Sequence, residues 1–262
     1  MSFSSKYHIF TCSTENYLNV TYVMLHSFYH YNNLPVTVYM VNCDISDAKE
    51  KFNEFPLVSC MRIDNITNKK HFQFNIDIIS AKFKIIDEVD SEYFLSLDGD
   101  MMFFESIEPV LMEYNTTIAG VTEKAICRSR LVNAGFMIVK KPKISLMEMF
   151  NNRWKETLTM PEQEIISVEF LHDMTILDSK YNTTWSTNLF GCENPAVLHY
   201  AIKTKPWLDI KETCKCIFFF PKFMCNLTLK YIDYALKLNL DSDFLDKLME
   251  NKKMYELLGG VK

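Results

Sequence analysis

The chain has 262 residues, of which 48% are hydrophobic and 23% charged, so it is long enough for one or two globular domains with a large core. Its formal net charge of −5 argues against an electrostatic grip on a phosphate backbone, and we expect no nucleic-acid partner. Only 6 residues are glycine, about 2% against an average of about 7%, and the internal ones form no cluster. Glycine-rich phosphate loops of the GxGxxG or Walker A type are therefore excluded.

The sequence offers no export signal and no cysteine-based metal site. Its first residues have too short an apolar run for a signal peptide, and no stretch reaches about 18 uninterrupted apolar residues. We therefore expect a soluble, cytoplasmic protein. The 8 cysteines are scattered without a CxxC pair, which predicts buried free thiols.

The first hundred residues alternate between short apolar runs and helical patterns. This alternation is the signature of βα units built around a parallel sheet. In such sheets, ligands bind beyond the carboxyl ends of the strands. The patterns predict strands at 7–12, 37–41, 58–63 and 93–97, and helices at 16–31, 46–54 and 76–89.

The second half is more mixed, and no linker of Pro, Gly or Ser separates it from the first. We expect a main domain at 1–221 and a C-terminal helical extension at 222–262. The extension has lysines beside apolar stripes, which leaves open a contact with a membrane surface, but packing on the domain or in a homodimer is the simpler interpretation. The patterns predict strands at 117–121, 135–139 and 196–200, helices near 144–157 and 162–172, and helical structure over 228–258.

An acidic turn follows the apolar run at 93–97. Asp98 and Asp100 are separated by Gly99 and are expected to project to the same side. Hard oxygen ligands at this spacing suit Mg²⁺ or Mn²⁺, which complete their shells with substrate phosphates. The alternative is an ordinary solvated turn, because Asp-Gly is a common turn dipeptide.

With this turn, the chain resembles the nucleotide-sugar glycosyltransferases of the GT-A fold, and most closely glycosyltransferase family 8, which includes glycogenin and bacterial lipooligosaccharide galactosyltransferases. The resemblance runs from residue 7 to about 207. It rests on five further segments in the family's order: Ser13-Thr14-Glu15-Asn16-Tyr17, Ser80-Ala81-Lys82-Phe83, Asn133-Ala134-Gly135, Glu162-Gln163-Glu164-Ile165, and His199-Tyr200 with Lys205-Pro206-Trp207.

The resemblance implies a GT-A fold, that is, a Rossmann-like α/β architecture with a mixed, mostly parallel sheet flanked by helices. It also implies an enzyme that moves a hexose from a UDP-sugar to a hydroxyl of a carbohydrate or glycoconjugate acceptor, with retention of configuration. UDP-glucose, UDP-galactose and UDP-N-acetylglucosamine are all compatible donors. The implied cofactor is Mn²⁺ or Mg²⁺.

The resemblance also assigns roles to individual residues. The metal ligands would be Asp98, Asp100 and His199. The catalytic residues, at the reacting sugar, would be Gln163, Glu162 and Asp100. Binding of the nucleotide sugar would involve Thr11, Asn16, Tyr17, Lys82, Asp98, Gly99, Asn133, Gly135 and Lys205.

Taken alone, several of these residues have simpler interpretations. A lone histidine such as His199 is more often a hydrogen-bonded structural residue than a ligand, and an isolated Lys205 is usually solvated. Gly135 allows either close approach of the backbone to a sugar or a tight turn. Trp207 is expected to pack in a core.

The chain also departs from the family pattern. Ile202 stands where the family has a glycine near the phosphates, and Lys82 lacks the bidentate contact that an arginine makes. The acids Glu162 and Glu164 are one methylene longer than the family's aspartates, so it stays open whether Glu162 or Gln163 touches the sugar. The alternatives are therefore a non-catalytic module that binds nucleotide sugars and, less favoured, a sugar-nucleotide pyrophosphorylase.

Overall fold

The computed structural model describes residues 6–64, 76–122, 131–157, 161–184, 194–201, 205–208 and 222–259. The chain divides into two compact units, Met1–His199 and Tyr200–Lys262. The predicted domain boundary after residue 221 stays a prediction, because compactness alone does not show which part folds on its own.

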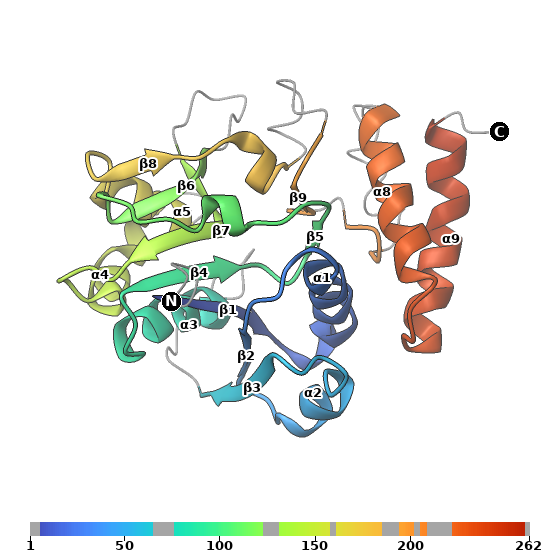
Figure 1. Ribbon diagram of the computed structural model, residues 1–262, viewed down its shortest axis with the longest axis horizontal. Helices are drawn as coiled ribbons and strands as arrows, with labels where there is room; N and C mark the ends of the chain where they lie inside the picture. Colours follow the sequence, from blue (N-terminus) through green and yellow to red (C-terminus); the bar gives the residue numbers. More distant parts are fainter. Residues whose placement is uncertain are drawn as a thin grey trace. The chain divides into compact units, whose positions relative to one another are not determined.

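The first unit is built on a seven-stranded sheet with the order β3-β2-β1-β4-β7-β6-β8 (Figure 1). The strand pairs β1–β2, β2–β3, β1–β4 and β6–β8 are parallel, whereas β7 runs antiparallel to both β4 and β6. This confirms the expected mixed, mostly parallel sheet. The strands are β1 (Tyr7–Ser13), β2 (Val36–Val41), β3 (Val58–Ile63), β4 (Tyr93–Leu97), β6 (Ile118–Thr122), β7 (Val132–Lys140) and β8 (Met174–Ile176).

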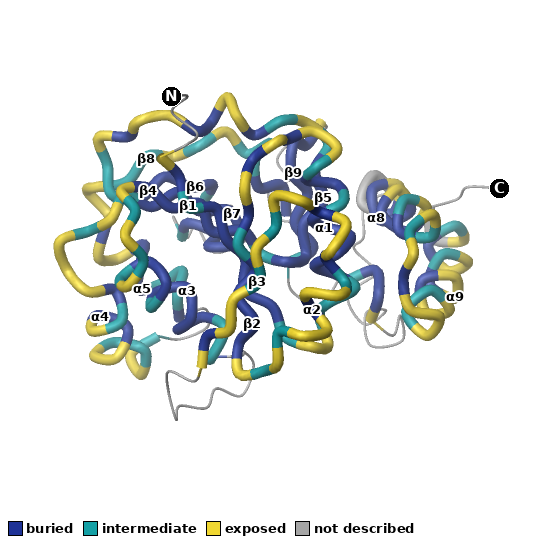
Figure 2. Tube along the Cα trace, turned by 60° about the horizontal axis from the view of Figure 1, so that its bottom comes forward, coloured by how far each residue is buried: buried dark blue, intermediate teal, exposed yellow. Residues whose placement is uncertain are grey.

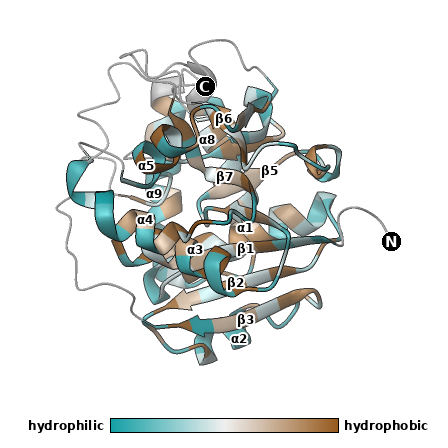
Figure 3. Cartoon of the chain, turned by 90° about the vertical axis from the view of Figure 1, so that its left-hand side faces the viewer, coloured by the Kyte–Doolittle hydropathy of each residue, from teal (hydrophilic) through white to brown (hydrophobic). Residues whose placement is uncertain are grey.

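Helices cover the sheet and bury its central strands (Figure 2). One hydrophobic cluster joins α3, α4 and α5 to side chains of β1, β2, β4, β6 and β7. The short α2 reads SDAKEK and is correspondingly hydrophilic (Figure 3). The helices of this unit are α1 (Leu18–Tyr31), α2 (Ser46–Lys51), α3 (Ile76–Glu88), α4 (Leu146–Arg153) and α5 (Pro161–Glu169), with 3₁₀ turns η2 (Glu15–Tyr17), η3 (Glu108–Val110), η4 (Trp154–Glu156) and η5 (Ser179–Asn182).

A second, two-stranded sheet follows the acidic turn. It pairs β5 (Met101–Phe103) with β9 (Val197–His199) in antiparallel register, so that Met101 lies opposite His199. Phe103 of β5 packs edge-to-face on Phe28 of α1, with ring centroids 5.1 Å apart. Because Met101 directly follows the acidic turn, this small sheet holds His199 beside the turn.

The predicted elements of the first unit are present, with shifted ends. The predicted helix at 16–31 starts as the 3₁₀ turn η2, and the one at 46–54 ends at Lys51. The strands β5 and β8 were not predicted, because three residues are too few to show a periodic pattern.

The described part of the second unit includes the helices α8 (Lys222–Ala235) and α9 (Ser242–Gly259), where the sequence predicted helical structure over 228–258. Tyr200, Trp207 and Tyr231 form its aromatic core, with the rings of Trp207 and Tyr231 5.4 Å apart. Trp207 is thus a packing residue, as expected. Within the described part of the chain, no helix combines the length and the apolar character needed to cross a membrane.

The cysteines that the structure describes all have free thiols, as expected: Cys12 and Cys225 are buried, whereas Cys43 and Cys60 are only half-buried, which differs from the expectation. The other four lie outside the described residues.

Candidate functional site

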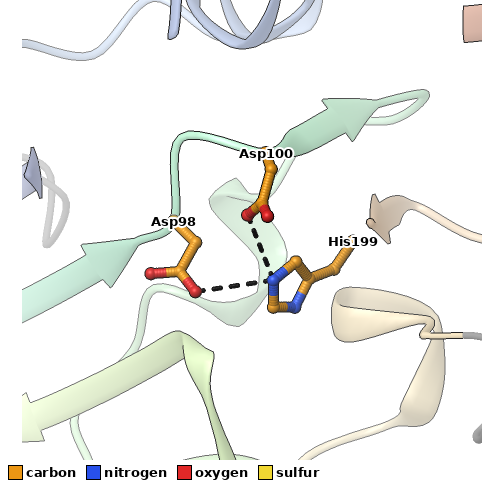
Figure 4. A group of neighbouring side chains, drawn as sticks. All are labelled: Asp98, Asp100 and His199. Carbon is orange, nitrogen blue, oxygen red and sulfur yellow. Dashed lines mark ion pairs between the residues drawn. The ribbon is translucent and has the colours of Figure 1, made fainter. Parts of the chain in front are cut away.

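The acidic turn and the histidine meet beyond the carboxyl end of β4 (Figure 4). Every residue of β4 is buried, and the backbone amide of Asp98 donates to the carbonyl of Gly135 at 2.8 Å, so the strand delivers Asp98 at a fixed place. Asp100 directly precedes β5, and His199 ends the paired strand β9. Both carboxylates point toward the imidazole ring.

The geometry of these three side chains is compatible with a cation site. Nε2 of His199 lies 3.2 Å from Oδ1 of Asp100 and 3.4 Å from Oδ2 of Asp98, and one ligand atom from each residue lies within 4.8 Å of the others. Ligands bound to one small divalent ion at about 2.1 Å are separated by about 3 Å when adjacent, so the spacing fits. Two carboxylates and one imidazole suit Mn²⁺ or Mg²⁺.

Lys82 holds the two acidic parts of the site together. Its buried ammonium contacts Oδ1 of Asp98 at 2.7 Å and Oε1 of Glu162 at 3.1 Å, and donates to the carbonyl of Ala134 at 3.4 Å. Asp98 therefore uses one oxygen for Lys82 and the other for His199. An ammonium buried in this way needs such partners to offset its lost hydration.

Charges in the site shift one another's pKa values. Burial alone would lower the pKa of His199, but the carboxylates of Asp100 and Asp98 raise it to about 9. Burial would raise the pKa of Asp98, yet the Lys82 ammonium and His199 hold it below its usual value. For Glu162, burial prevails over Lys82 and the pKa is raised. At neutral pH and without a metal, His199 is thus a cation between two carboxylates.

At two glycines of the site, neighbouring side chains occupy the space that a Cβ would need. A Cβ on Gly135 would lie 2.6 Å from Nδ1 of His199 and 2.9 Å from Oδ1 of Asn133. A Cβ on Gly99 would lie 2.9 Å from Oγ1 of Thr21 in α1. Real side chains essentially never approach so closely, so both glycines are needed for packing inside the protein. For Gly135 this is a third reason besides the two that the sequence suggested.

Asn133 is buried beside this glycine. Its Oδ1 accepts the backbone N–H of Gly135 at 2.9 Å and the side-chain amide of Asn182 at 2.8 Å. The single side-chain oxygen of Asn182, Oδ1, lies 3.0 Å from Nδ1 of His199. Asn182 was not predicted as a site residue, since a lone asparagine in an irregular part of the sequence gives no signal.

The other predicted site residues lie in varied surroundings. Asn16 is exposed and Tyr17 half-buried on η2, just beyond the carboxyl end of β1, whereas Thr11 in that strand is fully buried. Gln163 is half-buried in the first turn of α5, and its Oε1 is buried without a hydrogen-bond partner among the described residues.

Lys205 belongs to the second unit, where its ammonium lies 5.8 Å from the ring centre of Trp207. Ile202, the main departure from the family pattern, lies outside the described residues.

Comparisons with known proteins bear on the fold and on the resemblance. No known protein-family profile matches the chain. The structure superposes on that of the galactosyltransferase LgtC, solved with donor and acceptor sugar analogues, with a TM-score of 0.72 and 15% identity over 92% of this chain and 100% of that one. The chain has the GT-A fold and resembles family 8.

Two pneumococcal glycosyltransferases are also similar to this GT-A chain. GlyE of Streptococcus pneumoniae superposes with a TM-score of 0.63 and 16% identity, over 93% of this chain and 63% of that one. Glycosyltransferase GlyA of Streptococcus pneumoniae serotype 4 is 24% identical over 212 residues. The match covers 69% of this chain but only 29% of GlyA, so the chain corresponds to a part of that relative.

Proposed function

We propose that this protein is a metal-dependent glycosyltransferase that moves a hexose from a UDP-sugar to a hydroxyl of a carbohydrate or glycoconjugate acceptor. The observation that carries the proposal is the cluster of Asp98, Asp100 and His199 at the carboxyl edge of a GT-A sheet. Similarity to GlyA, whose name is that of a glycosyltransferase, supports the same class of activity.

The three clustered residues would hold Mn²⁺ or Mg²⁺. When bound, such an ion neutralises the charge that develops on a leaving diphosphate. Lys82 takes part indirectly: its ammonium fixes the Asp98 carboxylate through Oδ1 and leaves Oδ2 directed at the cation site. This differs from a direct contact with the donor, which the resemblance implies for the basic residue at this place.

The residues for the sugar come from α5 and β7. Glu162 and Gln163 lie in the first turn of α5, and the salt bridge from Lys82 aligns Glu162 with Asp98. The unpartnered Oε1 of Gln163 is an acceptor suited to a sugar hydroxyl near the anomeric carbon. Asn133 is retained as a sugar contact from the resemblance, although its Oδ1 already accepts two N–H groups.

At the nucleoside end, the exposed Asn16 and the half-buried Tyr17 would seat the base, near the end of the strand that contains Thr11. The resemblance also assigns Lys205 to the diphosphate. It implies retention of configuration, and the described residues of the site include no obvious strong nucleophile, so departure and attack on one face of the sugar is favoured over a covalent intermediate.

The test is hydrolysis of a panel of nucleotide sugars, measured as released nucleotide with Mn²⁺, with Mg²⁺ and with EDTA. We expect metal-dependent turnover of at least one UDP-hexose, and a loss of about 100-fold or more in Asp100→Asn, because that variant lacks one anionic ligand. The matched control is Asp90→Asn, which changes an exposed carboxylate just before β4, at the opposite end of that strand from the site.

Tight binding of nucleotide without turnover of any donor would contradict the proposal and favour a binding module. Exchange of pyrophosphate into a nucleotide sugar would favour a pyrophosphorylase instead.

A further inference from the structure

Two buried side-chain amides form a hydrogen-bond network with Nδ1 of His199, on the side of the ring away from the two aspartates. Asn182, the last residue of η5, is fully buried, and its amide lies between His199 and Asn133. Three hydrogen bonds connect the network: Gly135 to Asn133 at 2.9 Å, Asn182 to Asn133 at 2.8 Å, and Asn182 to His199 at 3.0 Å.

The backbone N–H of Gly135, at one end of this hydrogen-bond network, determines which atom donates and which accepts in every bond of the network. A backbone N–H only donates, so the atom of Asn133 that meets the amide of Gly135 is the oxygen Oδ1. That oxygen only accepts, so Asn182 turns its Nδ2 toward Asn133. Asn182 consequently presents its oxygen to His199, and Nδ1 of the ring must carry the hydrogen.

We propose that Asn182 is a positioning residue: it selects the Nδ1–H tautomer of His199 and thereby presents the lone pair of Nε2 to the cation site formed with Asp98 and Asp100. The metal half of this inference rests on the proposed function. The tautomer of the neutral ring depends only on this chain's own residues, whether or not an ion is bound.

The backbone keeps Asn182 in place for this task. Thr183 donates its backbone N–H to the carbonyl of Val197 at 2.9 Å, and the backbone N–H of His199 donates to the carbonyl of Thr183 at 2.9 Å. The segment that contains Asn182 is thus paired directly with the strand that contains His199. Gly135 adds to the constraint, since its missing Cβ makes the space that the ring occupies.

Selection of a histidine tautomer by a hydrogen bond to the other nitrogen is the common way in which proteins prepare a metal ligand. Loss of such a partner typically weakens metal binding about 10- to 100-fold. We therefore compare Asn182→Leu, which has a similar size but no polar atom, with Asn182→Asp, which keeps an acceptor for Nδ1–H but loses the N–H donated to Asn133. Thr183→Val is the matched control, because it removes a part-buried hydrogen bond of the same segment, to the carbonyl of Ser179, without touching the ring.

The first readout is the protonation of each ring nitrogen, observed by long-range ¹H–¹⁵N NMR of histidine-labelled protein in EDTA. The tautomer is read at a pH at which the ¹⁵N shifts themselves show the ring to be neutral. We expect Nδ1–H in the wild type, Asn182→Asp and Thr183→Val, and a shift toward Nε2–H in Asn182→Leu. An Nε2–H ring in the wild type, or an unchanged tautomer in Asn182→Leu, would overturn the proposal.

The second readout is the affinity for Mn²⁺ alone, measured by electron paramagnetic resonance. We expect a loss of about 10- to 100-fold in Asn182→Leu, with Asn182→Asp and Thr183→Val closer to the wild type. Equal affinity in Asn182→Leu and the wild type would overturn the positioning role. If the tautomer changes as expected but the wild type binds no Mn²⁺, the Asn182 assignment stands and the metal part of the proposed function fails. Should Asn182→Leu not fold, the wild-type tautomer still decides.

Discussion

At the scale of single residues, His199 carries a charge that only the folded protein stabilises. Its pKa is raised from 6.5 to about 9, chiefly by Asp100 and Asp98, which prevail over the opposing effect of burial. Because the folded-state pKa lies above the unfolded one, this stabilisation is complete below about pH 6.5 and is lost as pH rises through about 9. The loss amounts to about 3 kcal/mol of unfolding free energy at most.

We therefore expect the metal-free protein to lose stability between about pH 6.5 and 9.5, as measured by urea unfolding in EDTA. His199→Gln should flatten this dependence. Glu162 also has a raised pKa, so its contribution to the unfolding free energy falls as pH rises too. Any pH dependence that remains in His199→Gln is therefore attributed to groups such as Glu162. An equal pH dependence in the wild type and in His199→Gln would show that the imidazolium is not the group responsible.

At the scale of elements, α3 is linked to α4 because a carboxylate of α3 caps the N-terminus of α4. Asp87, near the end of α3, accepts the backbone N–H groups of Leu146 and Met147, each at 2.9 Å, and the hydroxyl of Ser145 at 2.7 Å. A carboxylate at a helix N-terminus satisfies amides that have no partner within the helix and interacts favourably with the helix dipole.

Replacing this cap should destabilise the protein without affecting the site. We expect Asp87→Ala to lower the unfolding free energy by about 1–2 kcal/mol, measured by urea denaturation, and to leave nucleotide-sugar hydrolysis unchanged. The neighbouring Glu88→Ala is the control, because its carboxylate is exposed and lies 3.9 Å from Lys84, so it should cost about 0.5 kcal/mol or less. A cost no larger than that of Glu88→Ala would refute the capping role.

At the scale of the whole molecule, the sequence predicted the α/β class, most of the strands and the meeting of the acidic turn with His199. These features follow from periodic patterns and from motifs that stand in a known order. The packing roles of Gly135 and Asn182 were not predictable, because they depend on which side chains meet across β7, β9 and η5. The salt bridge from Lys82 to Glu162 joins residues far apart in the chain, and no local pattern encodes it.

The second unit keeps its predicted helical character. Lys252 of α9 forms an ion pair with Asp233 of α8 at 2.8 Å, so the charge of this lysine is balanced within the two helices. Packing of these helices on the domain or in a homodimer, and their contact with a membrane surface, all stay predictions.

The most direct test of the cation site is thermal stabilisation by UDP-sugars with and without Mn²⁺, compared between the wild type and Asp100→Asn. A ligand that binds only the folded state raises the unfolding temperature, and the shift grows with the logarithm of the ligand concentration above Kd. We predict a shift in the wild type with UDP-hexose and Mn²⁺ together, a much smaller one with either alone, and none in Asp100→Asn. Stabilisation by another nucleotide but not by UDP-sugars, or an equal shift in Asp100→Asn, would contradict the assignment of Asp98, Asp100 and His199 as the cation site of a UDP-sugar transferase.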